Sequence, residues 1–105
     1  MRSQRSALSR ALANTIGTRL RTMRSTQRLP MVVLASLSGV DAATISRIER
    51  GRMPGTLESH LKLSRALGLT LAALYEGLEA RLPQTAIRDV FPRESDVAVP
   101  TPAHW

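Results

Sequence analysis

The strongest constraint on the fold is a junction of three residues, 38–40, between two segments that we expect to be helical. The first segment, about residues 31–37, follows Pro30, which suits the first turn of a helix. It ends at Gly39, which tolerates the left-handed conformation of a helix end. The second segment covers residues 41–50. Two helices joined by so short a glycine-containing turn must cross steeply, and this crossing pushes the second helix outward from the domain.

The outward helix, residues 41–50, has two unlike faces. With successive residues about 100° apart, Ile45 and Ile48 point to one side, where we expect the core. The opposite side carries only small and basic side chains, namely Ala42, Ala43, Ser46, Arg47 and Arg50. A helix with such an exposed face fits the major groove of duplex DNA.

The other helices are predicted from end signals and apolar spacing. N-caps are expected at Asn14 for a first helix (about 15–25), at Asp41 for the outward helix, at Thr56 for a fourth helix and at Thr70 for a fifth. The outward helix should end at Gly51 and the fourth at Gly68, and Gly77 should loosen the end of the fifth. Apolar residues recur at helical spacing as Ile16, Leu20 and Met23, then Leu57, Leu61, Leu63 and Leu67, then Leu71, Leu74, Tyr75 and Leu78. Asp41 should accept a backbone N–H near Thr44, and Val40 should pack on Ile45 across that cap. The sequence therefore predicts an all-α fold of five short helices.

The two ends of the chain differ from its middle. Residues 1–13 predict a flexible basic arm, residues 14–78 the helical domain, and residues 79–105 an irregular tail available for dimerisation or partner binding. Beyond Pro83 the stretch "AIRDVF" predicts a short strand, and the proline-rich remainder predicts flexible chain. An alternative is that this tail begins, or remains from, a larger effector-sensing regulator.

The positive charge is concentrated near the N-terminus. Residues 1–28 carry seven arginines and no acidic residue, whereas residues 29–55 have a net charge of +1 and residues 56–105 of −1. Nucleic acid is the natural partner for such a segment, and a membrane surface fits less well. Arg2, Arg5 and Arg10 could follow the phosphate backbone or enter a minor groove, or belong to a solubilising tail. The arginine- and serine-rich start also has the composition of a mitochondrial presequence, although "IGTRLRTMR" continues the pattern of the domain.

Several classes of function lack support in the sequence. The absence of cysteine excludes disulfides and thiolate chemistry and fits a reducing compartment. No apolar run approaches the ~18 residues of a membrane span, so we expect a soluble chain without membrane contact. His60, expected on a helix surface or rim, and His104 have no carboxylate placed to complete a metal site. No glycine-rich phosphate loop or nucleophile motif occurs. We therefore expect no enzyme activity, metal or cofactor, and scarce aromatic residues disfavour single-stranded nucleic acid.

Residues 16–78 resemble the Xre-type, lambda-repressor-like helix-turn-helix family. The resemblance rests on "IGTRLRTMR", "LASLSGVDAATISRIERG" and "LKLSRALGLTLAALYEGL", in this order and nearly without gaps. It implies a compact five-helix domain in a transcriptional regulator, most simply a repressor, that binds duplex DNA at two-fold symmetric operators as a homodimer. It also implies a cytoplasmic protein of bacterial or phage origin.

The resemblance further implies roles for individual residues. The base-reading positions of the family fall on Ala42, Ala43, Ser46 and Arg47, its backbone-contacting positions on Met31, Thr44, Arg50 and Arg52, and its buried ion pair on Arg24 and Glu49. Met31 departs from the usual glutamine and so lacks a donor for the DNA backbone. Gly55 resembles a one-residue insertion, which leaves the path of its loop open. For the ion pair, the alternative is a solvated surface pair worth under ~1 kcal/mol.

Among the base-reading positions, Arg47 is the expected main reader, because it can donate two hydrogen bonds to guanine O6 and N7. The alternatives are a phosphate contact or a solvated arginine. Ala42 and Ala43 can only pack on thymine methyl groups, so specificity could also depend on DNA shape or on the basic arm.

A second function remains open, that of an antitoxin or adaptor whose C-terminal tail binds a partner protein. The apolar stretch "MVVLASL" favours it, unless these side chains pack against the fourth helix. The operator, the regulated genes, the sign of regulation and any effector cannot be derived from the sequence.

Overall fold

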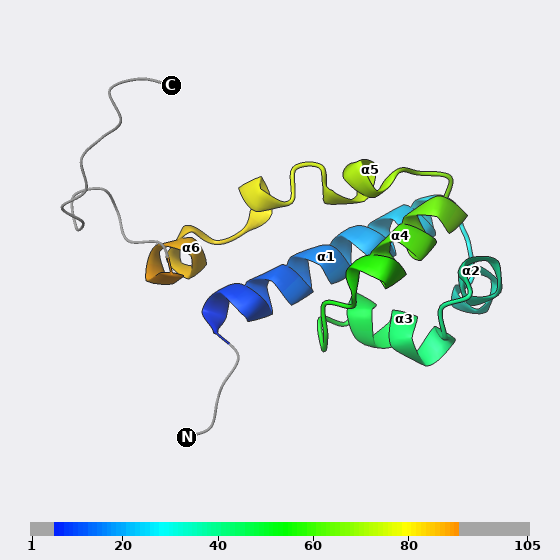
Figure 1. Ribbon diagram of the computed structural model, residues 1–105, viewed down its shortest axis with the longest axis horizontal. Helices are drawn as coiled ribbons and strands as arrows, with labels where there is room; N and C mark the ends of the chain where they lie inside the picture. Colours follow the sequence, from blue (N-terminus) through cyan, green and yellow to red (C-terminus); the bar gives the residue numbers. More distant parts are fainter. Residues whose placement is uncertain (1–5, 91–105) are drawn as a thin grey trace.

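The computed structural model describes residues 6–90, the last two by their backbone only. This part of the chain contains six α-helices and one short 3₁₀ helix and no strand, with α1 at Ala7–Thr26, α2 at Met31–Ser38, α3 at Ala42–Glu49, α4 at Leu57–Ala66, α5 at Leu71–Tyr75, η1 at Glu79–Arg81 and α6 at Gln84–Val90. The prediction of an all-α fold is confirmed. Helix α1 is the long central rod, with α3 against its middle and α6 beside its N-terminal half, while α4 packs against α2 and α5 (Figure 1).

The predicted start of the first helix is wrong. Helix α1 begins at Ala7, where the Ser6 hydroxyl accepts the N–H of Ser9 at 3.0 Å, and not at Thr15. The extra turns are stabilised by tertiary packing, because α6 lies against this half of α1 and both Ala13 and Ala86 are buried. Residues 7–13, which the sequence assigns to a basic arm, are therefore helical.

The core is aliphatic and joins the first four helices. Its buried members are Leu20, Leu34, Val40, Ile45, Ile48, Leu63 and Leu67. The expected core side of α3 is thus confirmed, and Val40 and Ile45 belong to the same core. Two leucines predicted for the apolar stripe of α4, Leu57 and Leu61, are instead exposed, because α4 buries only one side of its surface.

Most predicted caps form, with small differences. Gly39 ends α2 with φ of 79°, Thr56 and Ser59 form a reciprocal capping box at α4, and Thr70 caps α5. Asp41 caps α3 by accepting the N–H of Ala43 at 3.0 Å, one residue before the position expected. These local signals set the helix ends because each cap bonds backbone groups that would otherwise have no partner.

The C-terminal segment is more helical than predicted. Helix α5 ends at Tyr75, so Leu78 lies beyond it, and η1 and α6 follow within the stretch predicted as an irregular tail. The strand predicted for "AIRDVF" is wrong as far as Val90, because these residues form α6 against α1, and Phe91 lies outside the described residues.

His60 is buried, which corrects its predicted place on a helix surface. Its Nε2 lies 2.6 Å from the carbonyl oxygen of Pro54, and its Nδ1 lies 2.6 Å from the hydroxyl of Tyr75. In the neutral ring, Nε2–H donates to the carbonyl while Nδ1 accepts from the phenol, so both ring nitrogens are satisfied. The imidazole thus joins the loop after α3 to α4 and α5, and burial raises the pKa of the Tyr75 phenol.

No single helix in residues 6–90 has the length and apolar character to cross a membrane. Helices α2 and α3 pass that test only when taken together, as a pair bent by 117°.

Candidate nucleic-acid interface

The turn between α2 and α3 has the geometry expected from its sequence. Gly39 adopts the left-handed conformation and donates its N–H to Ala35, while the N–H of Val40 bonds the Ser38 hydroxyl at 3.1 Å. The two helices consequently cross at 117°, and Val40 enters the core. The steep crossing carries α3 away from α2 and leaves one side of α3 open.

Helix α3 buries one side and exposes the other. Ile45 and Ile48 are completely buried, whereas Ala43, Arg47 and Arg50 are exposed. An open hollow on this exposed side is lined by Ala43, Ser46, Arg47, Arg50 and Arg52. The structure therefore brings three predicted base readers and two predicted backbone-contacting residues to one surface.

The remaining predicted positions lie around this surface. Ala42 and Thr44 are half-buried on the first turn of α3. Met31, at the first turn of α2, is half-buried against the core, so its side chain packs inward instead of reaching out. Pro30 precedes it and provides no side-chain cap, which leaves the start of α2 without a polar side chain for a phosphate.

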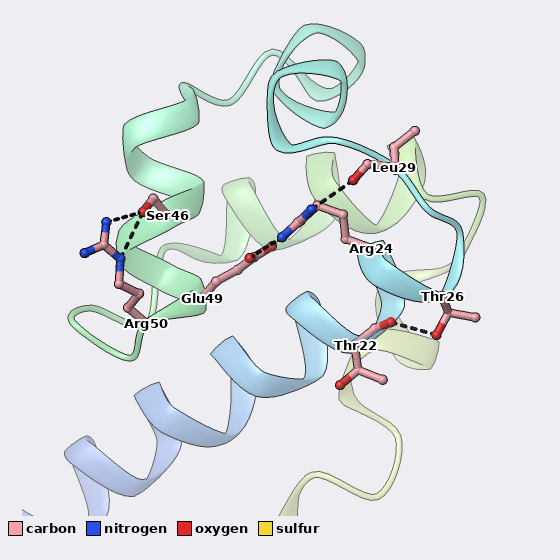
Figure 2. Close-up of polar contacts among 7 residues, drawn as sticks. All are labelled: Thr22, Arg24, Thr26, Leu29, Ser46, Glu49 and Arg50. Atoms are coloured by element: carbon pink, nitrogen blue, oxygen red, sulfur yellow. Dashed lines mark hydrogen bonds and ion pairs between the residues drawn. The ribbon is translucent and has the colours of Figure 1, made fainter.

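Ser46 and Arg50 form a contact that the sequence reasoning did not anticipate. The Nε and Nη2 of Arg50 donate to the Ser46 hydroxyl at 3.2 and 2.8 Å, so the guanidinium folds back along α3 (Figure 2). Their i, i+4 spacing was the available signal. The structure thus couples a predicted base reader to a predicted backbone contact.

Arg24 and Glu49 hold α1 against the C-terminal end of α3. The Nε and Nη2 of Arg24 donate to the two carboxylate oxygens of Glu49 at 2.7 and 2.8 Å, and Nη1 donates to the Leu29 carbonyl at 2.9 Å (Figure 2). The side chains are only 15% and 4% exposed, so this is not the alternative of a solvated surface pair. The hydrogen bond to Glu49 raises the pKa of Arg24, against the opposing effect of burial.

Two glycines set the distance between α1 and the end of α3, and the sequence reasoning gave neither this role. A Cβ on Gly17 would lie 2.1 Å from the carbonyl oxygen of Ile48, and a Cβ on Gly51 would lie 2.1 Å from Oδ1 of Asn14. The only sequence signal for the first was a glycine inside a helix, which often marks close approach of another backbone. These contacts fix α3 relative to α1.

The described residues do not assemble a metal site. No three His, Asp or Glu side chains in residues 6–90 lie together as metal ligands. The exposed side of α3 offers instead a protruding helix with methyl groups, a hydroxyl and guanidinium groups.

A steeply crossed helix pair with this exposed second helix is the architecture of a helix-turn-helix DNA-binding domain. A family model described as a helix-turn-helix domain matches residues 15–76. Because this match covers more than half of the chain, the protein belongs to the helix-turn-helix family, in agreement with its Xre-like sequence. Comparisons with curated proteins and with solved structures gave no match.

Proposed function

We propose that the protein is a transcriptional repressor that binds a palindromic operator as a homodimer, with α3 in the major groove. The observation that carries the proposal is the exposed side of α3, where Arg47 stands beside Ala43 and Ser46. Within residues 6–90, no hydrogen bond or ion pair engages the Arg47 guanidinium, so it is available to a base edge.

The proposed readout divides the surface by chemistry. Arg47 donates two hydrogen bonds to guanine O6 and N7, while Ala42 and Ala43 contact thymine methyl groups. Arg50, Arg52 and Thr44 contact the DNA backbone, together with the main-chain N–H groups at the start of α2. Ser46 accepts from Arg50, and its own O–H can still donate to a base edge.

Two-fold symmetry of the complex is part of the proposal. The exposed Leu57 and Leu61 of α4 support a second copy as partner, because apolar side chains exposed on adjacent turns favour burial between proteins. Residues 79–105 are a second candidate segment for dimerisation or for binding a partner protein. We place the protein in the cytoplasm, where an operator is accessible.

Selection of binding sites from random duplexes tests the proposal. A palindrome should be enriched, and Arg47→Ala should lose about 1–3 kcal/mol of discrimination at a single guanine position in each half-site. Arg65→Ala, on the far end of α4, is the matched control and should select the wild-type site. Enrichment of no sequence by the wild-type protein would refute specific readout, and a uniform loss with Arg47→Ala would make it a phosphate contact.

A second function, as an antitoxin or adaptor that binds a protein, is favoured by the outer side of α2. Val32 and Leu37 are 67% and 62% exposed, so they do not pack against α4 as the sequence alternative suggested. Co-purification of a stoichiometric protein that is lost with Val32→Lys/Leu37→Lys, while operator binding is retained, would establish this function. If that protein still co-purifies after residues 91–105 are removed, the partner binds α2 and not the C-terminal tail.

A further inference from the structure

One row of residues along α1 faces α3. Oδ1 of Asn14 lies against Gly51, Gly17 lies against the backbone at the end of α3, and Arg24 holds Glu49. Positions 14, 17 and 24 lie on one side of the α-helix. Positions 10 and 21 lie on the same side, because residues three or four apart follow one another along a helix face. Because three residues of this row contact the end of α3, the other two positions of the row are on the side of α1 that is turned toward α3.

Arg10 and Arg21 occupy those two places, and both are exposed. Arg21 lies between the contacts of Gly17 and Arg24, so it stands at the margin of the seam between α1 and α3. Arg10 lies one turn beyond Asn14 toward the N-terminus of α1, about 6 Å farther along the helix axis, where α1 extends past the end of α3. On α3 itself, Glu49 turns into this seam, while Arg50, the next residue, is exposed and contacts Ser46 on the open side of the helix.

The exposed side chains around the end of α3 include several arginines. Arg50 and Arg52 contribute two positive charges from α3 and the turn after it, and the row on α1 adds two more. Of the two acids in residues 6–56, Glu49 is held by Arg24, and Asp41 caps the opposite end of α3. Four arginines arranged around one helix end form a positive surface that suits closely spaced phosphates.

We propose that Arg10 and Arg21 form a second set of phosphate contacts, which binds the sugar–phosphate backbone beside the groove that α3 enters. The inference rests on the proposed function, and it adds that α1 extends the contacted duplex beyond the base pairs read by α3. These contacts contribute affinity and orientation without reading sequence.

The test measures the salt dependence of binding by the full chain. The variants Arg10→Gln and Arg21→Gln, singly and together, are compared with Arg65→Gln, an exposed arginine on α4 outside the row. Binding to the selected operator and to a mixed-sequence duplex about three helical turns long is followed by fluorescence anisotropy. Each row variant should lower the slope of log K against log [salt] by about 0.9. For the double variant, the loss of affinity between 50 and 200 mM salt should therefore be about twelvefold smaller than for the wild type.

The same experiment separates the inference from the proposed function. Arg65→Gln should keep the wild-type slope, and Arg10→Lys/Arg21→Lys should restore it, which excludes a merely structural effect. Hydroxyl-radical footprints of the double variant should lose protection at one border of each half-site. If the Arg10 and Arg21 variants had the same salt slope as Arg65→Gln while Arg47→Ala still lost discrimination, the proposed function would stand and the inference about α1 would be overturned. Loss of discrimination at one base in a row variant would also overturn it, and binding to no duplex at all would refute both proposals.

Discussion

Removal of the Glu49 carboxylate should destabilise the domain strongly. In Glu49→Ala, the Arg24 guanidinium loses two charge-assisted hydrogen bonds and remains 85% buried beside an emptied site. Breaking one partner of a buried pair costs about 3–5 kcal/mol. The lower end applies, about 3 kcal/mol, because Nη1 keeps its bond to the Leu29 carbonyl at 2.9 Å. That is a large share of the stability of a domain of this size, about 5–10 kcal/mol.

Urea unfolding, followed by the helical circular dichroism signal, measures this loss as a shift of the midpoint at constant slope. The matched control is Glu58→Ala, because Glu58 pairs with Lys62 at 2.8 Å on the surface of α4 and both side chains are well exposed. The control should unfold at the wild-type midpoint, since exposed pairs contribute little. Equal midpoints for Glu49→Ala and the control would refute the assignment of a buried, stabilising ion pair.

Three further changes test the packing and the caps. Gly17→Ala should lower the free energy of unfolding by about 1–3 kcal/mol, although alanine ordinarily favours a helix, because its Cβ would meet the Ile48 carbonyl oxygen at 2.1 Å. A midpoint at or above that of the wild type would show that α1 and α3 do not approach closely. Burial holds the pKa of Tyr75 above its ordinary 10.0, so the unfolded chain releases the phenolic proton first as pH rises. The stability contributed by the neutral phenol is therefore complete below pH 10.0 and is lost as pH rises through the folded-state pKa. Tyr75→Phe should remove that alkaline decline in melting temperature, and an unchanged decline would contradict the burial. Thr56→Ala removes the oxygen that accepts the Ser59 N–H at 3.0 Å, so it should cost about 1 kcal/mol in urea unfolding. A loss no larger than that of Glu58→Ala would show that the capping box does not stabilise α4.

The sequence determined the helix pair and the character of its outward helix. The turn at Gly39, the cap at Asp41 and the two faces of α3 depend on residues a few positions apart, so periodicity and capping chemistry specify them locally. The pairing of Arg24 with Glu49 was reached through the family resemblance, and the structure adds its burial and its third bond to Leu29.

Only the tertiary structure decided where α1 begins, that residues 84–90 form a helix, and that His60 is buried. The first turns of α1 and the helix at Gln84–Val90 form because each packs on the other, and neither has a strong local signal. His60 is buried because Pro54 and Tyr75 offer an acceptor and a donor from other segments. Contacts between distant parts of the chain determine burial, whereas the pattern of one helix shows only which sides are apolar. The same reason explains why the positions of Arg10 and Arg21 relative to α3 follow from the packing at Gly17 and not from the charge of the N-terminal segment.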